Sequence, residues 1–337
     1  MPSDAASSRG PRWTDWADGL PPASGAVVMA TAVLSVGLHL LGVEWASVAL
    51  LVVALVVWLF LATVFARHLL TERERWHREI DTPPALTAVA ATAVLGTRLS
   101  LLGHQAVSVA LLCLSVLLWP LLMSHVIRHW QSRVPGAAYL VCVATQAIVV
   151  LAATVATADR QAWLMWPALV LFVIGLVLYA VVLIRFDFRQ LATGRGDHWI
   201  IAGAMAISAL AGSKLVAAAV PQGTLRWATP AHDVLRIVTL VALGLAFAWY
   251  AVLVVCELRW PRLHYDVRRW ATVFPLAMTA VAALSTSTAA AVPALWTCGK
   301  VLIWPALAVW AVVAAGAFRA ARDRTGAQAS AGLTPQR

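Results

Sequence analysis

Charged residues are scarce in this chain of 337 residues, where Asp, Glu, Lys and Arg together make up 12%, against roughly 25% in soluble domains. Hydrophobic residues make up 61%, and the mean hydropathy is +0.81. So little charge is not typical of a soluble globular protein, and that class is excluded. The composition predicts an integral membrane protein.

Cysteine is also rare, and its spacing argues against two kinds of bound group. The four cysteines, Cys113, Cys142, Cys256 and Cys298, lie inside apolar runs without CxxC or CxxCH spacing. Such positions are typical of small core residues rather than of zinc ligands or haem attachment sites. We therefore expect no metal and no cofactor.

Acidic residues are missing from the middle of every apolar run. Glu44, Asp159, Asp233 and Glu257 all lie at the ends of runs. Proton-coupled and sodium-coupled carriers usually need buried carboxylates to bind the coupling ion. The absence of such carboxylates favours passive movement of a solute, driven by the membrane potential.

What the sequence does contain is ten apolar runs of about 20 residues, the length that an α-helix needs to cross a hydrocarbon core of about 30 Å. Open strands would leave backbone groups unpaired in lipid, and the runs lack the alternation of a barrel. They cover residues 22–42, 46–66, 84–103, 105–127, 136–157, 163–184, 198–220, 233–256, 270–290 and 295–318. The predicted fold class is all-α integral membrane. A channel domain over residues 21–319 would lie between a cytoplasmic tail at 1–20 and a disordered cytoplasmic tail at 320–337.

The positions of the basic residues predict the orientation. Nineteen of the 25 Lys and Arg residues lie in the two tails and in the loops after spans two, four, six and eight. By the positive-inside rule, both termini are then cytoplasmic in a multi-pass protein of the plasma (inner) membrane. The net charge of +10 is mostly an orientation signal and secondarily an attraction to anionic lipid. It is not evidence for nucleic-acid binding.

A repeat predicts how the spans are organised. ATAVLSVGLHLLG at residues 30–42 and ATAVLGTRLSLLG at residues 91–103 share nine of thirteen residues, and AMAISALAGSKL from Ala204 echoes them. Odd spans rich in small residues would then form an inner ring, and each would be followed by a return helix. The ten helices become five helical hairpins in a quasi-five-fold ring around a central pore. Chance similarity among Ala-, Val- and Leu-rich segments is the alternative.

Four basic residues lie toward the predicted external ends of apolar runs: Arg98, Lys214, Arg236 and Lys300. Positive charge at a pore mouth raises the local concentration of anions and repels cations. The alternative is that these long side chains reach the headgroups from helix ends, and Arg236 can also pair with Asp233. We predict that Arg98, Lys214 and Lys300 attract anions.

Two further stretches, DHWIIAGAMAISALAG (Asp197 to Gly212) and WATVFPLAM (Trp270 to Met278), resemble the tellurite-resistance/dicarboxylate transporter family. LPPASGAVVMAT (Leu20 to Thr31) resembles its first span more loosely, and the similarity covers essentially all ten runs. The family includes tellurite-resistance channels, slow-type anion channels, malate permeases and sulfite pumps. The resemblance implies a homotrimer in which each protomer has a pore of five inner helices surrounded by five outer ones.

The resemblance also implies a gate. An aromatic ring from the ninth span plugs the pore in that family, and Phe274 is the matching residue; a lipid-facing Phe is the alternative. Pro275 follows directly, and a proline inside a helix removes a hydrogen bond and favours a kink. One departure is Met29-Ala30-Thr31-Ala32, where many relatives have Met-Gly-Thr-Gly. The lost glycines are expected to narrow or stiffen the pore there, and they put the inherited substrate in doubt.

The predicted function is a passive anion channel or facilitator rather than an enzyme. Its substrates would be small inorganic anions, sulfite or malate-like C4 dicarboxylates. The sequence does not choose among these anions, because selectivity depends on pore radius and electric field rather than on a readable motif. The alternative is a membrane-embedded enzyme or a metal-binding membrane protein. His125 and His129 are spaced i, i+4 and could bind a metal on one helix face, but no third ligand follows from the spacing.

Overall fold

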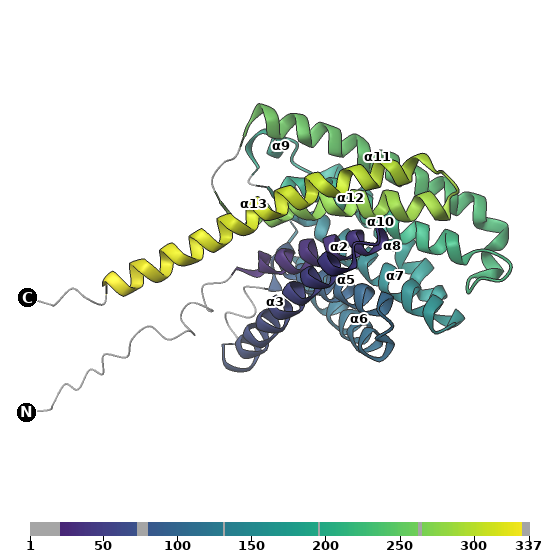
Figure 1. The fold of residues 1–337 in the computed structure, drawn as a ribbon, viewed down its shortest axis with the longest axis horizontal. Helices are drawn as coiled ribbons and strands as arrows, with labels where there is room; N and C mark the ends of the chain where they lie inside the picture. Colours follow the sequence, from purple (N-terminus) through teal and green to yellow (C-terminus); the bar gives the residue numbers. More distant parts are fainter. Residues whose placement is uncertain (1–20, 73–79, 131, 195, 262–264, 332–337) are drawn as a thin grey trace, which may run out of the picture.

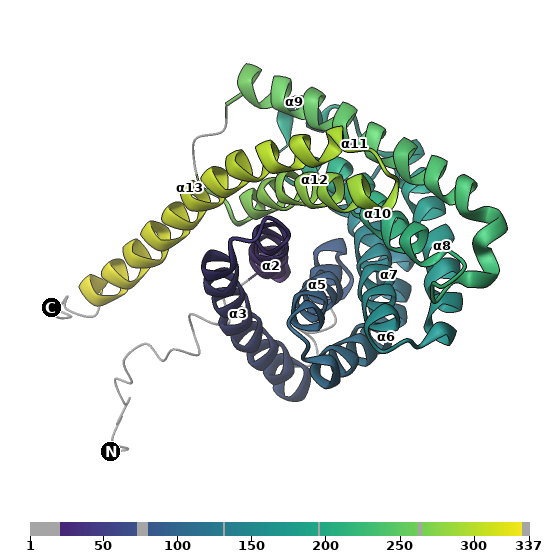
Figure 2. The ribbon, with the colours of Figure 1, turned by 45° about the vertical axis from the view of Figure 1, so that its right-hand side comes forward.

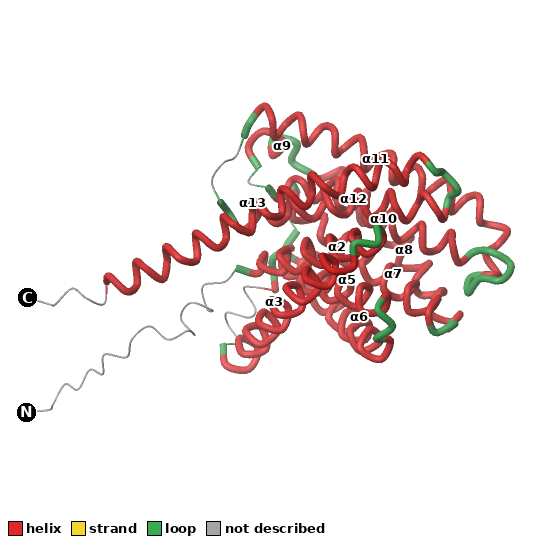
Figure 3. The backbone as a smooth tube through the Cα atoms, in the orientation of Figure 1, coloured by secondary structure: helices red, strands yellow, loops and turns green. Residues whose placement is uncertain are grey.

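The computed structural model describes residues 21–72, 80–130, 132–194, 196–261 and 265–331, and within these ranges the chain folds into helices without strands (Figure 3). Ten long helices build the described fold. They are α2 (Gly25–Leu40), α3 (Glu44–Thr71), α5 (Thr87–Leu101), α6 (Gln105–Arg128), α7 (Leu140–Ala158), α8 (Met165–Arg185), α10 (Ile200–Ala218), α11 (His232–Arg259), α12 (Trp270–Ala289) and α13 (Ala294–Ala331). The short helix α9 (Gln190–Thr193) lies in the connection between α8 and α10.

Two kinds of helix alternate along the chain. In α5, α7, α10 and α12, 83–94% of the most apolar window is buried inside the protein, whereas in α3, α6, α8, α11 and α13 only 17–33% is buried. Most of α2 is buried as well. Each of the five buried helices is entered through a 3-10 turn, at Pro22–Ser24, Pro83–Leu86, Gly136–Tyr139, Asp197–Trp199 and Val267–Arg269. We call the buried set the inner helices and the exposed set the outer helices.

Each inner helix packs against the outer helix that follows it, which gives five consecutive hairpins: α2 with α3, α5 with α6, α7 with α8, α10 with α11, and α12 with α13. The inner helices also contact one another in chain order, and α12 contacts α2 (Figures 1 and 2). These contacts form a closed cycle. Small residues make the close approach possible, because a bulky side chain on an inner helix would hold its neighbour away.

The same hydroxyl recurs on all five inner helices. Thr31, Thr92, Thr145, Ser208 and Thr279 each donate a hydrogen bond to the backbone carbonyl four residues earlier, at 2.7–2.8 Å. A buried hydroxyl needs such a partner, because little water reaches it inside the bundle. The five inner helices therefore share one side-chain bond as well as their order in the hairpins.

Three of these hydroxyls also accept a bond from a tryptophan of the preceding hairpin. The indole Nε1 of Trp58 on α3 donates to Thr92 at 2.9 Å, and Trp119 on α6 donates to Thr145 at 2.9 Å. Trp310 on α13 donates to Thr31 on α2 at 3.0 Å, which joins the last hairpin to the first. The indoles thus tie outer helices to the next inner helix around the cycle.

The two copies of the repeat end in the same way. Gly42 and Gly103 have φ values of +77° and +87°, which glycine adopts without strain. Val43 N donates to Leu38 O at 2.9 Å and His104 N donates to Leu99 O at 3.0 Å, the six-to-one bond of a Schellman cap. Each glycine therefore ends an inner helix and allows the chain to turn back as an outer helix.

The prediction of an all-α membrane protein is confirmed. Nine helices in the described ranges are long and apolar enough to cross a membrane; α2, with 16 residues, is a shorter apolar helix of about 24 Å. At the C-terminal end, α13 continues to Ala331 and projects from the bundle (Figure 1). The expected disordered tail is therefore helical over residues 320–331. The predicted tail at 1–20 and residues 332–337 lie outside the described residues.

The indole bonds generate a prediction. Trp58→Phe keeps an aromatic ring but removes the donor to Thr92, so we expect a loss of about 1 kcal/mol in the free energy of unfolding. Trp45→Phe is the control, because Trp45 is 81% exposed. Thermal unfolding of the purified protein in one detergent measures both, and equal melting temperatures for the two variants would contradict the structural role of the bond.

Candidate functional site

A cavity of about 400 Å³ opens where the inner helices begin. It is lined by residues at or just before the N-terminal ends of all five, including Met29 on α2, Thr87 on α5, Leu140 on α7, Ile200 on α10 and Phe274 on α12. We call this cavity the vestibule. It carries charge of both signs, because Asp197, Asp266 and Arg268 also line it. The backbone N–H of Arg268 donates to Asp266 at 2.9 Å, and the two side chains form an ion pair at 3.5 Å.

Phe274 occupies the inner part of this site. It is only 1% exposed, although it lines the vestibule. Its ring lies against Gly203 of α10, where an added Cβ would be 2.8 Å from Cε1 of Phe274 and 2.9 Å from Cγ of Pro275. Gly203 therefore leaves the room that the ring and the proline occupy. Pro275 lies within α12, and Thr279 bonds back to its carbonyl at 2.8 Å.

A second, much smaller cavity of about 20 Å³ lies further along the inner helices. Its lining comes from all five of them: Val33 and Val36 on α2, Val94 and Thr97 on α5, Val150 on α7, Ile207 and Leu210 on α10, and Met278 and Val281 on α12. We call these nine residues the apolar collar. Side chains spaced four and seven residues apart share one face of a helix, so Phe274, Met278 and Val281 follow one line along α12. Met29, Val33 and Val36 do the same along α2. The vestibule and the collar thus lie in sequence along the inner helices.

Lys214 continues this line toward the far end of α10. It follows Leu210 of the collar by four residues, which places it on the same face one turn further on. Its side chain is partly exposed. Beside it, Ser213 of α10 and Ser285 of α12 are joined by a hydrogen bond of 2.8 Å. The structure therefore places Lys214 at the end of the inner helices that lies opposite the vestibule.

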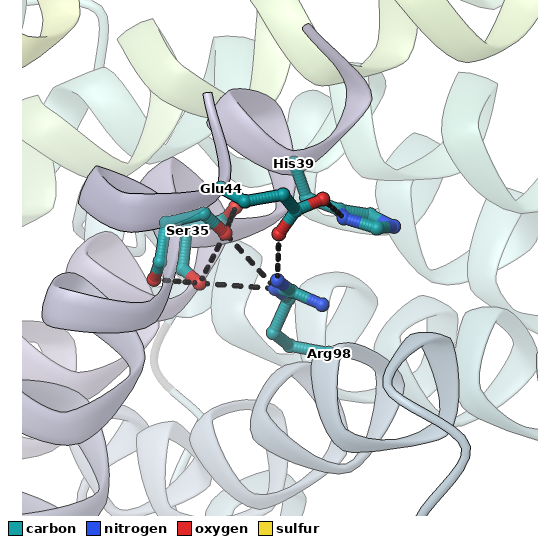
Figure 4. Close-up of polar contacts among 5 residues, drawn as sticks. Ser35, His39, Glu44 and Arg98 are labelled. Carbon is teal, nitrogen blue, oxygen red and sulfur yellow. Dashed lines mark hydrogen bonds and ion pairs between the residues drawn. The ribbon is translucent and has the colours of Figure 1, made fainter. Parts of the chain in front are cut away.

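Arg98 on α5 follows Val94 of the collar by four residues, but its polar contacts are with α2 and α3. Its side chain is fully buried between α5, α2 and α3, and its Nη2 donates to Glu44 Oε2 at 3.0 Å (Figure 4). Its Nε lies 3.2 Å from the hydroxyl of Ser35 and 3.1 Å from that of Ser47. Glu44 also pairs with His39 through its other oxygen. The sequence-based prediction that Arg98 attracts anions did not include Glu44, which offsets the charge of Arg98.

The two remaining basic candidates lie elsewhere. Lys300 is exposed on the outer helix α13, beside Gly299, which faces α12. Arg236 on α11 donates from Nε to the carbonyl of Ala290 at 3.0 Å, at the C-terminal end of α12. Arg98, Lys214 and Lys300 are thus not brought together at one site. Arg98 and Lys214 each follow a collar residue on an inner helix, but Arg98 is paired with Glu44 of α3.

His125 on α6 and His129, directly after its last residue, face one carboxylate. His125 Nδ1 lies 3.0 Å and His129 Nδ1 lies 3.5 Å from the same oxygen of Asp81. Across the described ranges, no group of three or more His, Cys, Asp or Glu side chains has an arrangement that could hold a metal ion.

Sequence reasoning missed several residues of the site. Glu44 was noted only as an acidic residue at the end of a run, and Gly203 was not singled out from the small residues of the odd spans. Ala30 and Ala32, the departure from the family pattern, are fully buried and belong to neither cavity lining. They do not narrow the axis with their own side chains. The spacing of 61 residues between Trp58 and Trp119, equal to that of the repeat, was a usable signal of their equivalence.

The ion pair of Arg98 generates a prediction. Glu44→Gln would leave a fully buried guanidinium without its counterion, and we expect this to lower the free energy of unfolding by about 2 kcal/mol. Glu72→Gln is the control, because Glu72 pairs at 3.6 Å with Arg67, whose side chain is partly exposed, whereas that of Arg98 is fully buried. Thermal unfolding in detergent measures the difference. A melting temperature that changes no more for Glu44→Gln than for Glu72→Gln would show that the pair is dispensable.

Comparison with known proteins identifies the family of this chain. A search of curated proteins returned no match. The family model described as voltage-dependent anion channel matches residues 19–318, which is most of the chain and includes every inner helix. The match confirms the resemblance drawn from the sequence, and it supports transport of anions across a membrane rather than catalysis. The chain belongs to the voltage-dependent anion channel family.

Proposed function

We propose that this protein is a passive anion channel or facilitator, with a pore along the axis of the inner helices of each protomer. One observation carries the proposal. In a member of an anion channel family, the vestibule, Phe274, the collar and Lys214 follow one another along five inner helices that contact in a closed cycle. All ten long helices would cross the plasma membrane, with α2 extended by its 3-10 turn and both termini in the cytoplasm. The vestibule then faces the cytoplasm.

Phe274 is the proposed gate. Its ring is almost fully buried between the vestibule and the collar, and Gly203 and Pro275 define the space that it fills. A ring in that place blocks the axis until it rotates or α12 bends at Pro275. Bending is supported by the missing N–H of the proline, which leaves the carbonyl of Ala271 without its helical partner.

Lys214 is the proposed source of anion attraction at the external end. It lies one turn beyond the collar on an inner helix, and a positive charge there raises the local anion concentration. Arg98 contributes less to this field because Glu44 neutralises it, and it acts chiefly by joining the first two hairpins. Lys300, exposed on an outer helix, adds a weaker and more screened contribution.

The proposed substrates are small inorganic anions such as chloride and nitrate, sulfite, and malate-like C4 dicarboxylates. Passive movement is supported by the collar, whose nine residues include no carboxylate to bind a coupling ion. We also propose a homotrimer in the lipid bilayer, with one pore in each protomer. This part of the proposal follows from the family alone.

The gate generates a prediction. Phe274→Ala removes the ring, so we expect anion flux through purified protein in liposomes to rise about two- to fivefold, with cation flux unchanged. Chloride, nitrate, sulfite and malate would each be measured against potassium. Phe318→Ala is the control, because Phe318 is exposed on α13. A flux that is equal in all three proteins and independent of the anion would exclude the channel.

Neutralising Lys214 gives a separate prediction. Lys214→Met should lower anion flux several-fold at low ionic strength, and the difference should shrink as salt screens the charge. Lys300→Met is the matched control and should have a smaller effect, because Lys300 lies on an outer helix. Equal flux in wild type and Lys214→Met at low salt would remove Lys214 from the proposed mechanism.

A further inference from the structure

The side chains of the apolar collar are nearly as buried as that of Phe274. Its nine side chains are each between 0% and 6% exposed, and they come from all five inner helices. The cavity that they enclose measures about 20 Å³, little more than the space that one water molecule requires. The collar is thus a constriction of its own, about one helical turn beyond Phe274.

The chemistry of the lining makes this constriction dry. A buried water molecule needs two to four polar partners, and eight of the nine collar side chains are aliphatic or thioether groups. The exception is Thr97, whose hydroxyl already donates to the carbonyl of Ala93 at 2.9 Å. No polar hydrogen of the collar is left to solvate an anion, and bringing an unsolvated ion into an apolar site is very costly. Hydrophobic constrictions of this kind stop ions by excluding water.

We infer that the apolar collar is a second closed barrier in the permeation path, in series with Phe274, and that anions pass only when the collar widens and fills with water. This rests on the proposed function and extends it. Opening Phe274 alone leaves the collar shut. Two barriers in series both limit the flux. When either one is removed, the other still limits the flux, so each change alone gives only a small gain.

Leu210 offers the most direct test, because it is a large collar side chain on α10. Leu210→Ala widens the collar, and Leu215→Ala is the matched control, since Leu215 is fully buried on the same helix outside the collar. Anion flux in liposomes would be compared for each variant, alone and combined with Phe274→Ala. We expect Leu210→Ala alone to raise flux less than about twofold, and the Phe274→Ala/Leu210→Ala double variant to exceed Phe274→Ala at least tenfold. Val150→Ala, on α7, is a second widening variant should Leu210→Ala fold poorly.

The inference is overturned if Phe274→Ala already gives the full flux. In that case, adding Leu210→Ala would change the flux no more than adding Leu215→Ala does. Equal gains from the two leucine changes would mean that the collar is ordinary core packing.

A labelling experiment tests the collar independently of transport. Thr97→Cys places a thiol in the collar, and a small charged methanethiosulfonate reagent is added to both sides of the membrane. Mass spectrometry of the peptide that contains position 97 separates this thiol from the native cysteines. We expect no modification in the otherwise wild-type protein or with Phe274→Ala, and modification once Leu210→Ala is combined with Phe274→Ala. Modification with Phe274→Ala alone overturns the inference. If no variant conducts anions, the proposed function fails, and the labelling still decides whether the collar is closed.

Discussion

The close approach of the inner helices is the constraint on which the rest of the structure depends. Five helices contact one another in a cycle only if the side chains between them are small, and α2, α5, α7, α10 and α12 meet this condition with Ala, Gly, Ser and Thr. Two of these small residues, Ser and Thr, carry a hydroxyl, and a hydroxyl buried between helices must be hydrogen bonded. The structure meets that need with one recurring device, a Thr or Ser bonded to its own helix. At three junctions a tryptophan from the preceding hairpin adds a second bond.

The same constraint shapes the axis. Inner helices that pack this closely leave little space between them, so a few larger side chains on the facing surface are enough to close it. Phe274 fits because Gly203 opposite has no side chain. One turn further on, mostly aliphatic side chains from all five helices meet around a space of about 20 Å³. Charged residues lie at the two ends: Asp197, Asp266 and Arg268 around the vestibule, and Lys214 beyond the collar. In the proposed channel, charged ends and a dry middle are suited to holding ions back until the helices move.

Much of the fold could be predicted from the sequence, because hydrophobic length and a repeated segment both leave direct marks on it. The pairing of ATAVLSVGLHLLG with ATAVLGTRLSLLG predicted equivalent hairpins, and the equal Schellman caps at Gly42 and Gly103 bear out the equivalence of these two. The direction of the Arg98 side chain could not be predicted from the sequence. In the repeat Arg98 replaces Gly37, and both positions face the outer helix of the preceding hairpin, Ile303 on α13 for Gly37 and Ser47 and Glu44 on α3 for Arg98. Composition shows that a charge is present, but only the rotation of the helix shows that it faces a carboxylate rather than the axis. The collar was not predicted for the same reason, since Val and Leu occur on every face of these helices.

In the proposed channel, the axis of the inner helices conducts anions selectively once its two constrictions are relieved. The most direct test is the reversal potential of the Phe274→Ala/Leu210→Ala variant in a planar bilayer under a gradient of potassium chloride. We expect a reversal potential close to the chloride equilibrium potential, because Lys214 favours anions at the external end and the collar has no carboxylate to bind a cation. A reversal potential near zero or near the potassium equilibrium potential would contradict it.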